Sequence, residues 1–142
     1  MAPDGIFKLR AEDADDLAVI SACLQDALVS VRDLTYDDAA RRFVAVANRF
    51  RREAADTPPF ERTLCAVAFN DIDGVSYRGF RRRDDDRILS LLAIRAGSGV
   101  IDLEFSGDAT VRLSTPTIHC LAADIGEPWP TVWQPGHPDD AP

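Results

Sequence analysis

Residues 87–113 read RILSLLAIRAGSGVIDLEFSGDATVRL, and this stretch decides the fold. Apolar and polar residues alternate over 101–106, a pattern typical of a strand with one buried side and one solvent-facing side. The glycine turns GSG and GD separate it from apolar segments before and after it. The stretch therefore predicts three adjacent antiparallel strands, at 87–96, 101–106 and 109–113.

The first of these strands is the most apolar part of the chain. Its run LSLLAI offers apolar side chains to both faces, which is typical of a strand in the interior of a sheet. We therefore predict that it is central and that Leu92 and Ile94 lie in the core.

The N-terminal part begins with a short extended segment and a helix. Leu17, Ile20 and Leu24 recur at helical spacing, and Asp13 and Asp15 can each cap the first turn. These residues predict a helix over 14–26.

Further strands are predicted before and after these three in the sequence. A hairpin is predicted from 28–34 and 42–50. Its second arm is apolar on both faces, so other parts of the protein should pack on both faces of part of the hairpin. After a loop at 53–61, two strands are predicted at 63–69 and 75–80. The segment 117–125 reads either as a strand, favoured at its beginning, or as a helix closed by Gly126.

The resulting fold class is α+β and β-dominated. We predict an antiparallel barrel or roll of about seven to eight strands with one helix near the N-terminus. A pleckstrin-homology-like roll fits by strand count, although its helix usually comes last. Residues 1–142 should form a single domain, and residues 127–142 are predicted to be a proline-rich C-terminal tail.

Composition narrows the functional classes. A net charge of −8 and a pI near 4.6 disfavour nucleic-acid binding, because phosphate backbones are repelled. Three widely spaced cysteines, no signal peptide and no apolar stretch of membrane-spanning length favour a cytoplasmic protein without a membrane partner.

No enzyme or cofactor motif is present, so we predict no catalytic residues, no metal and no cofactor. Asn70-Asp71-Ile72-Asp73-Gly74 echoes half of a calcium loop, but the twelfth position is Arg81, and a hairpin turn explains the same residues. His119 and Cys120 should point to opposite faces of a strand and share no site.

Two groups of side chains remain as candidate sites. Trp129 and Trp133 are predicted to form an interface, with either this domain's own sheet or a partner, because indoles bury large apolar areas. Arg81, Arg82 and Arg83 are candidate anion-binding residues, although three aspartates follow them and a solvated loop is the favoured reading.

Several short strings resemble, in the same order, the domain-of-unknown-function 2948 family of small alphaproteobacterial proteins. They are Leu24–Ala27, Arg42-Phe43, Asn48–Phe50, Leu91–Ile94 and Asp124–Trp129. The resemblance covers about residues 6–133, and one departure is Arg52, where an aromatic residue is expected before Glu53. The family implies no catalytic residues, so no activity follows from it.

Two functions are therefore compared. The first is a non-enzymatic module of the bacterial cytoplasm that binds a protein partner or forms a homo-oligomer, through a sheet edge or the tryptophan-bearing tail. The alternative is a small-ligand binder or enzyme whose unrecognised pocket contains Arg and Asp side chains. A filled interior and an exposed apolar patch would favour the first, and a cavity with converging arginines and a buried carboxylate would favour the second.

Overall fold

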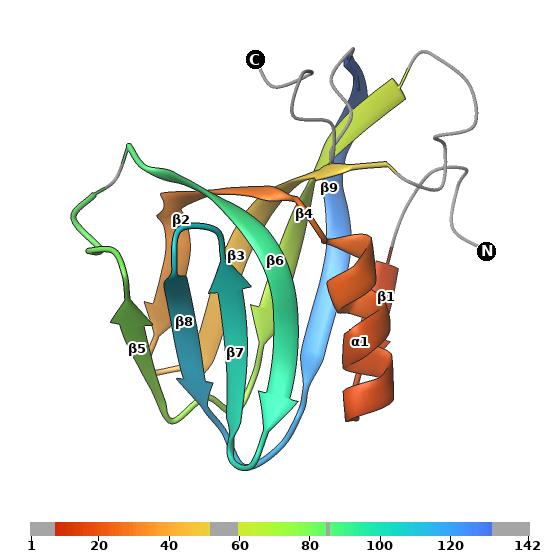
Figure 1. Cartoon of the computed structure of the whole chain (residues 1–142). Helices are drawn as coiled ribbons and strands as arrows, with labels where there is room; N and C mark the ends of the chain where they lie inside the picture. The colour runs from red at the N-terminus through yellow and green to blue at the C-terminus, as the bar shows by residue number, and fades with distance from the viewer. Residues whose placement is uncertain (1–7, 52–59, 85, 132–142) are drawn as a thin grey trace.

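A computed structural model describes residues 8–51, 60–84 and 86–131 of the chain, which form a curled antiparallel sheet and one helix (Figure 1). In chain order the elements are β1 (Lys8–Ala11), α1 (Ala14–Cys23), β2 (Leu28–Asp37), β3 (Arg42–Phe50), β4 (Phe60–Phe69), β5 (Gly74–Arg78), β6 (Ile88–Gly97), β7 (Val100–Phe105), β8 (Ala109–Ser114) and β9 (Cys120–Thr131). The order of strands across the sheet is β1-β9-β4-β3-β2-β6-β7-β8-β5.

The sheet curls at β2, which pairs with β3 on one side and with β6 on the other. A register shift between Val29 and Leu34 marks the place where β2 bends. The half that contains β6, β7, β8 and β5 then lies in front of the half that contains β3, β4 and β9 (Figure 1). The predicted β-dominated class is confirmed, but the sheet has nine strands and does not close, and α1 lies beside β6 and β1 where it opens.

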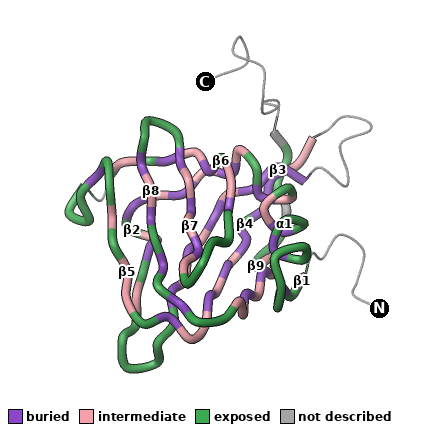
Figure 2. Tube along the Cα trace, turned by 60° about the horizontal axis from the view of Figure 1, so that its bottom comes forward, coloured by how far each residue is buried: buried purple, intermediate pink, exposed green. Residues whose placement is uncertain are grey.

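The core fills the space between the two halves. Along most strands, buried residues alternate with partly exposed ones (Figure 2). Phe43 and Phe69 are fully buried on neighbouring strands, with ring centroids 6.4 Å apart. From the facing half, Ile101, Leu103 and Phe105 point inward, as their alternation predicts.

The helix is shorter than predicted. The Asp16 N–H donates to Asp13 Oδ1 at 2.8 Å, so the predicted cap is present, but the helix ends at Cys23 and not at residue 26. Asp26 has a φ of 67° and its N–H donates to the Leu91 carbonyl. This backbone bond to β6 takes the chain out of the helix and into β2.

The C-terminal segment corrects two expectations. Strand β9 begins at Cys120, so the end of 117–125 is strand and its beginning, where a strand was favoured, is not. The strand continues to Thr131, where a tail was predicted from residue 127. Beyond Ala123, β9 pairs only with β4, and the N–H-lacking prolines 128 and 130 are compatible with an edge position. Gly126, with a φ of 79°, lies in the bulge that resets the register. Phe60 and Glu61, predicted to be loop, extend β4 alongside this part of β9.

The prediction for Leu92 is wrong. Strand β6 does lie inside the sheet order, and Leu89, Leu91 and Ile94 are buried, but Leu92 is 47% exposed. The register against β7 shifts between Leu91 and Ala93. The extra residue there moves the inward set from odd to even positions, and Leu92 is left on the outside.

Candidate functional site

The outer surface of β3, β4 and β9 is apolar. Side chains on this surface are those that alternate with the core residues of the three strands, and cross-strand pairing brings them side by side. We call the following set the outer apolar face: Val44, Val46, Leu64, Ala66, Ala68, Leu121, Ala123 and Ile125. These eight residues are contiguous across three strands and contain no ionisable side chain. On the same side of β3 and β4, they are bordered by Arg42, Asn48 and Arg62.

Water reaches this face. Leu64 is 39% exposed and Ile125 is 42% exposed, and the other six residues are partly exposed. An uncovered sheet gives such values, because neighbouring side chains shield one another. Contiguous apolar patches of this kind mark interaction surfaces more often than scattered exposed residues do.

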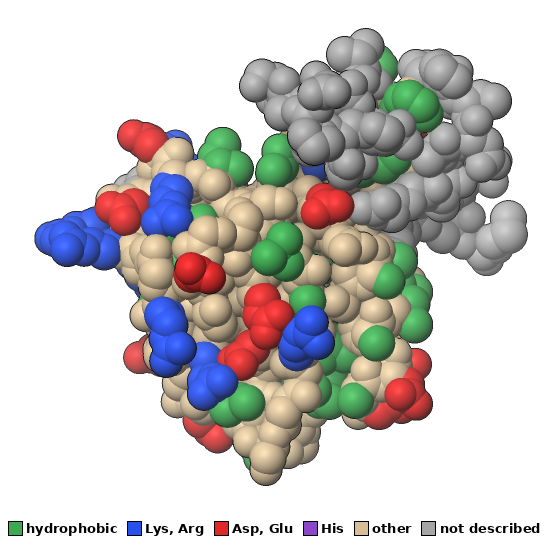
Figure 3. Space-filling view, in the orientation of Figure 1, with side chains coloured by type: hydrophobic (Ala, Val, Ile, Leu, Met, Phe, Trp, Pro, Cys, Tyr) green, Lys and Arg blue, Asp and Glu red, His purple; other side chains and the backbone are tan. Residues whose placement is uncertain are grey.

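The opposite outer surface has the reverse character. On β7 and β8, Arg112 donates to both Asp102 carboxylate oxygens at 2.8 Å, and Arg95 of β6 pairs with Glu104 at 2.8 Å. The hydrogen bonds from Arg112 lower the pKa of Asp102. Basic and acidic side chains are spread over the surface that faces the viewer in Figure 3. The apolar character of the β3-β4-β9 surface is therefore a local property and not a general one.

Of the two tryptophans predicted to form an interface, the structure describes one. Trp129 is in β9, directly across from Arg62 of β4, and is 37% exposed, so it borders the outer apolar face at one end. Trp133 lies outside the described residues. The interface role of the pair stays a prediction.

The three predicted arginines do not converge on one point. Arg82 lies over the Tyr77 ring, 5.4 Å from its centroid, and donates to the Leu34 carbonyl at 3.3 Å. Arg81 and Arg83 are exposed, and the Arg81 backbone N–H donates to Asp84 Oδ2. The guanidinium of Arg82 therefore packs against the domain, and the anion-binding role of the three arginines stays a prediction.

The structure contains a buried ion pair that the sequence did not predict. Arg49 Nε and Nη2 donate to Asp124 Oδ1 and Oδ2 at 2.8 and 2.7 Å, and the two side chains are only 1% and 5% exposed. Next to it, Arg51 pairs with Glu61. Alternation could have found Arg49, because it continues the inward series of Phe43, Ala45 and Ala47.

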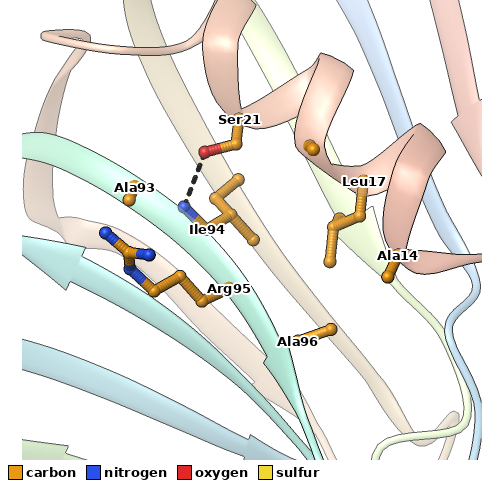
Figure 4. A pocket seen from close by; sticks show the side chains of 8 residues that line it. Ala14, Leu17, Ser21, Ala93, Ile94, Arg95 and Ala96 are labelled. Atoms are coloured by element: carbon orange, nitrogen blue, oxygen red, sulfur yellow. Dashed lines mark hydrogen bonds between the residues drawn. The ribbon is translucent and has the colours of Figure 1, made fainter.

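Two depressions lined by described residues lie away from this pair. Each charge of the pair is matched by its partner, and the linings of both depressions are other residues. The larger, about 460 Å³, lies between α1 and β6, where Ser21 Oγ accepts a hydrogen bond from the Ile94 N–H (Figure 4). The other, about 350 Å³, contains one carboxylate, Glu12. Neither brings an arginine together with a buried carboxylate.

Residues 70–73 connect β4 to β5, which begins at Gly74, but this connection is not the predicted hairpin turn, because β5 pairs with β8 and not with β4. His119 Nδ1 is 3.9 Å from the Asp71 carboxylate at the surface, whereas Cys120 is fully buried, so the two neighbours share no site. Within the part of the chain that the structure describes, no three His, Cys, Asp or Glu side chains are grouped to hold a metal ion. The described helix is also too short and polar to cross a membrane.

The cysteines differ in their expected reactivity. Burial raises the pKa of Cys65 and of Cys120 to about 12, whereas Cys23 is partly exposed. Raised values keep both buried thiols protonated at pH 8, so they should be poor nucleophiles. We expect a thiol reagent to modify only Cys23 in the folded protein and all three cysteines in denaturant, as counted by intact mass. Modification of Cys65 at the rate of Cys23 would contradict this.

Comparison with known proteins gives one match. A family model described as "Protein of unknown function (DUF2948)" matches residues 7–137. Searches of curated proteins and of solved structures find no match.

Proposed function

The chain belongs to the DUF2948 family, which has no assigned activity. From its own surface, we propose that it is a non-enzymatic protein-binding module. The outer apolar face is the single observation that carries this proposal. Its partner is a protein surface that is itself flat and apolar.

The interior supports this function over the ligand-binding alternative. The space between the sheet halves is filled by large apolar side chains such as Phe43, Phe69 and Ile72. Arg49, the most buried arginine among the described residues, is engaged by Asp124. A substrate would have to displace a bidentate, desolvated ion pair to use either group.

Charge and thiol content support a setting in the bacterial cytoplasm. A net charge of −8 disfavours nucleic acid as the partner. The three cysteines are free thiols, which is typical of a reducing compartment.

The proposal is tested by placing a charge on the face. In Leu64→Asp and Ile125→Asp, the carboxylate would have to lose its hydration on docking, so binding should fall at least tenfold. Capture from a lysate of the source organism, quantified by mass spectrometry, is compared between the wild type and these variants.

Val19→Asp is the matched control, because Val19 is 53% exposed but lies on α1, away from the face. Proteins lost by both face variants and retained by the control support the proposal. Identical capture by all four proteins, with folding verified by circular dichroism, contradicts it.

A further inference from the structure

We infer that the outer apolar face docks on the same face of a second copy of this chain, which gives a two-fold symmetric dimer. This inference rests on the proposed function and names its partner. It follows from how large and small side chains are arranged in rows across β4 and β9.

Two rows on the face are complementary to each other. One row contains Leu64 and Ile125, cross-strand neighbours and the most exposed residues of the face. The adjacent row contains Ala66 and Ala123, also cross-strand neighbours, and continues on β3 with Val46. A raised pair of branched side chains therefore lies beside a hollow that is made by two methyl groups and bounded by Val46.

A two-fold axis between these rows, perpendicular to the strands, makes the two copies fit. It places Leu64 over Ala66 of the second copy, and Ile125 over its Ala123, and each contact occurs twice. Such reciprocal contacts define a symmetric interface. Strands then run antiparallel across the interface, which is compatible with aligned packing of two sheets about 10 Å apart.

Charge is also compatible with self-association. The face contains no carboxylate, although the chain carries a net charge of −8. Lys8 of β1 is paired with Ala123 and extends the alanine row. The same axis places Lys8 at the flank of Ile125 of the second copy, next to the β9 bulge that contains the exposed Glu127. The rim of the contact therefore has charges of both signs.

The size of the face sets the expected strength. With strands about 4.8 Å apart and same-face residues about 6.8 Å apart along a strand, the five face positions in the two overlapping rows cover about 160 Å² of sheet plane. A standard interface buries about 800 Å² on each partner. We therefore expect a reversible dimer that forms at protein concentrations on the order of 100 µM, and not an obligate one.

Sedimentation velocity of the full chain, from about 5 to 500 µM, tests the dimer over a range that brackets this value. The wild type and Val19→Asp should shift from monomer to dimer across this range. Leu64→Asp and Ile125→Asp should stay monomeric throughout, a loss of more than tenfold in affinity.

A swap of side chains tests the register. Leu64→Ala removes the large side chain and Ala66→Leu fills the hollow, so each should weaken the dimer at least fivefold. The double variant exchanges the two and should return to within about threefold of the wild type, because residue 64 of one copy faces residue 66 of the other.

The outcomes separate this inference from the function on which it rests. A wild type that stays monomeric at 500 µM, or a dimer unaffected by the face variants, overturns the dimer. If capture from lysate still depends on the face, the protein-binding function stands with a different partner. If neither assay responds to the face variants, both proposals fail.

Discussion

Replacing Arg49 by alanine is expected to lower the free energy of unfolding by about 3–5 kcal/mol. The Asp124 carboxylate would lose two guanidinium hydrogen bonds of 2.7–2.8 Å in a place where bulk water hardly reaches it. For a chain of this size, the midpoint of thermal unfolding should fall by about 10–15 °C. Calorimetry or denaturant titration measures both quantities.

A matched control exists on the charged outer surface. Arg112 forms a bidentate pair of nearly the same length with Asp102, but its side chain is 54% exposed, so Arg112→Ala should change stability little. The double variant Arg49→Met with Asp124→Leu removes both buried charges and should recover most of the loss. An Arg49→Ala loss no larger than that of Arg112→Ala would show that the buried pair is not desolvated.

The second large effect is expected in β6, where adjacent leucines should behave differently. Leu91→Ala should destabilise the protein by about 2–5 kcal/mol, because Leu91 is 3% exposed and its removal leaves a cavity. Leu92→Ala should cost less than about 1 kcal/mol, since the side chain is 47% exposed. Denaturant midpoints at a common slope give the comparison.

This pair of variants tests the bulge between Leu91 and Ala93. If Leu92→Ala were the more damaging of the two, the inward set of β6 would be the one expected from its composition, and the register would differ.

Much of the fold was predictable because its signals are local. Alternation over 101–106 and the glycine turns around it need no information from distant residues, and the predicted strands there are confirmed. The end of α1 and the side on which Leu92 lies depend on hydrogen bonds to other strands. Local periodicity contains no record of such pairing.

The candidate site was only partly predictable for the same reason. The sequence of residues 42–50 is apolar on both faces of the strand, which indicated that Val44 and Val46 form an apolar surface opposite the core side. That Ala66 and Ala123 lie beside them depends on the placement of β9 next to β4. The Arg49–Asp124 pair joins residues 75 positions apart, a distance at which no spacing rule applies.

The position of β9 between β1 and β4 also determines when the molecule can fold during its synthesis. Strand β1 is made before every other described strand, yet Ala123, the cross-strand neighbour of Lys8, lies in the described strand that is made last. Until then β1 has no pairing partner and β4 has a bare edge. Closing so long a loop is slow, and unpaired edges invite association with other chains. We therefore expect the nascent chain to stay unfinished until its C-terminal strand is released, and to depend on chaperones when it is made faster than it can fold.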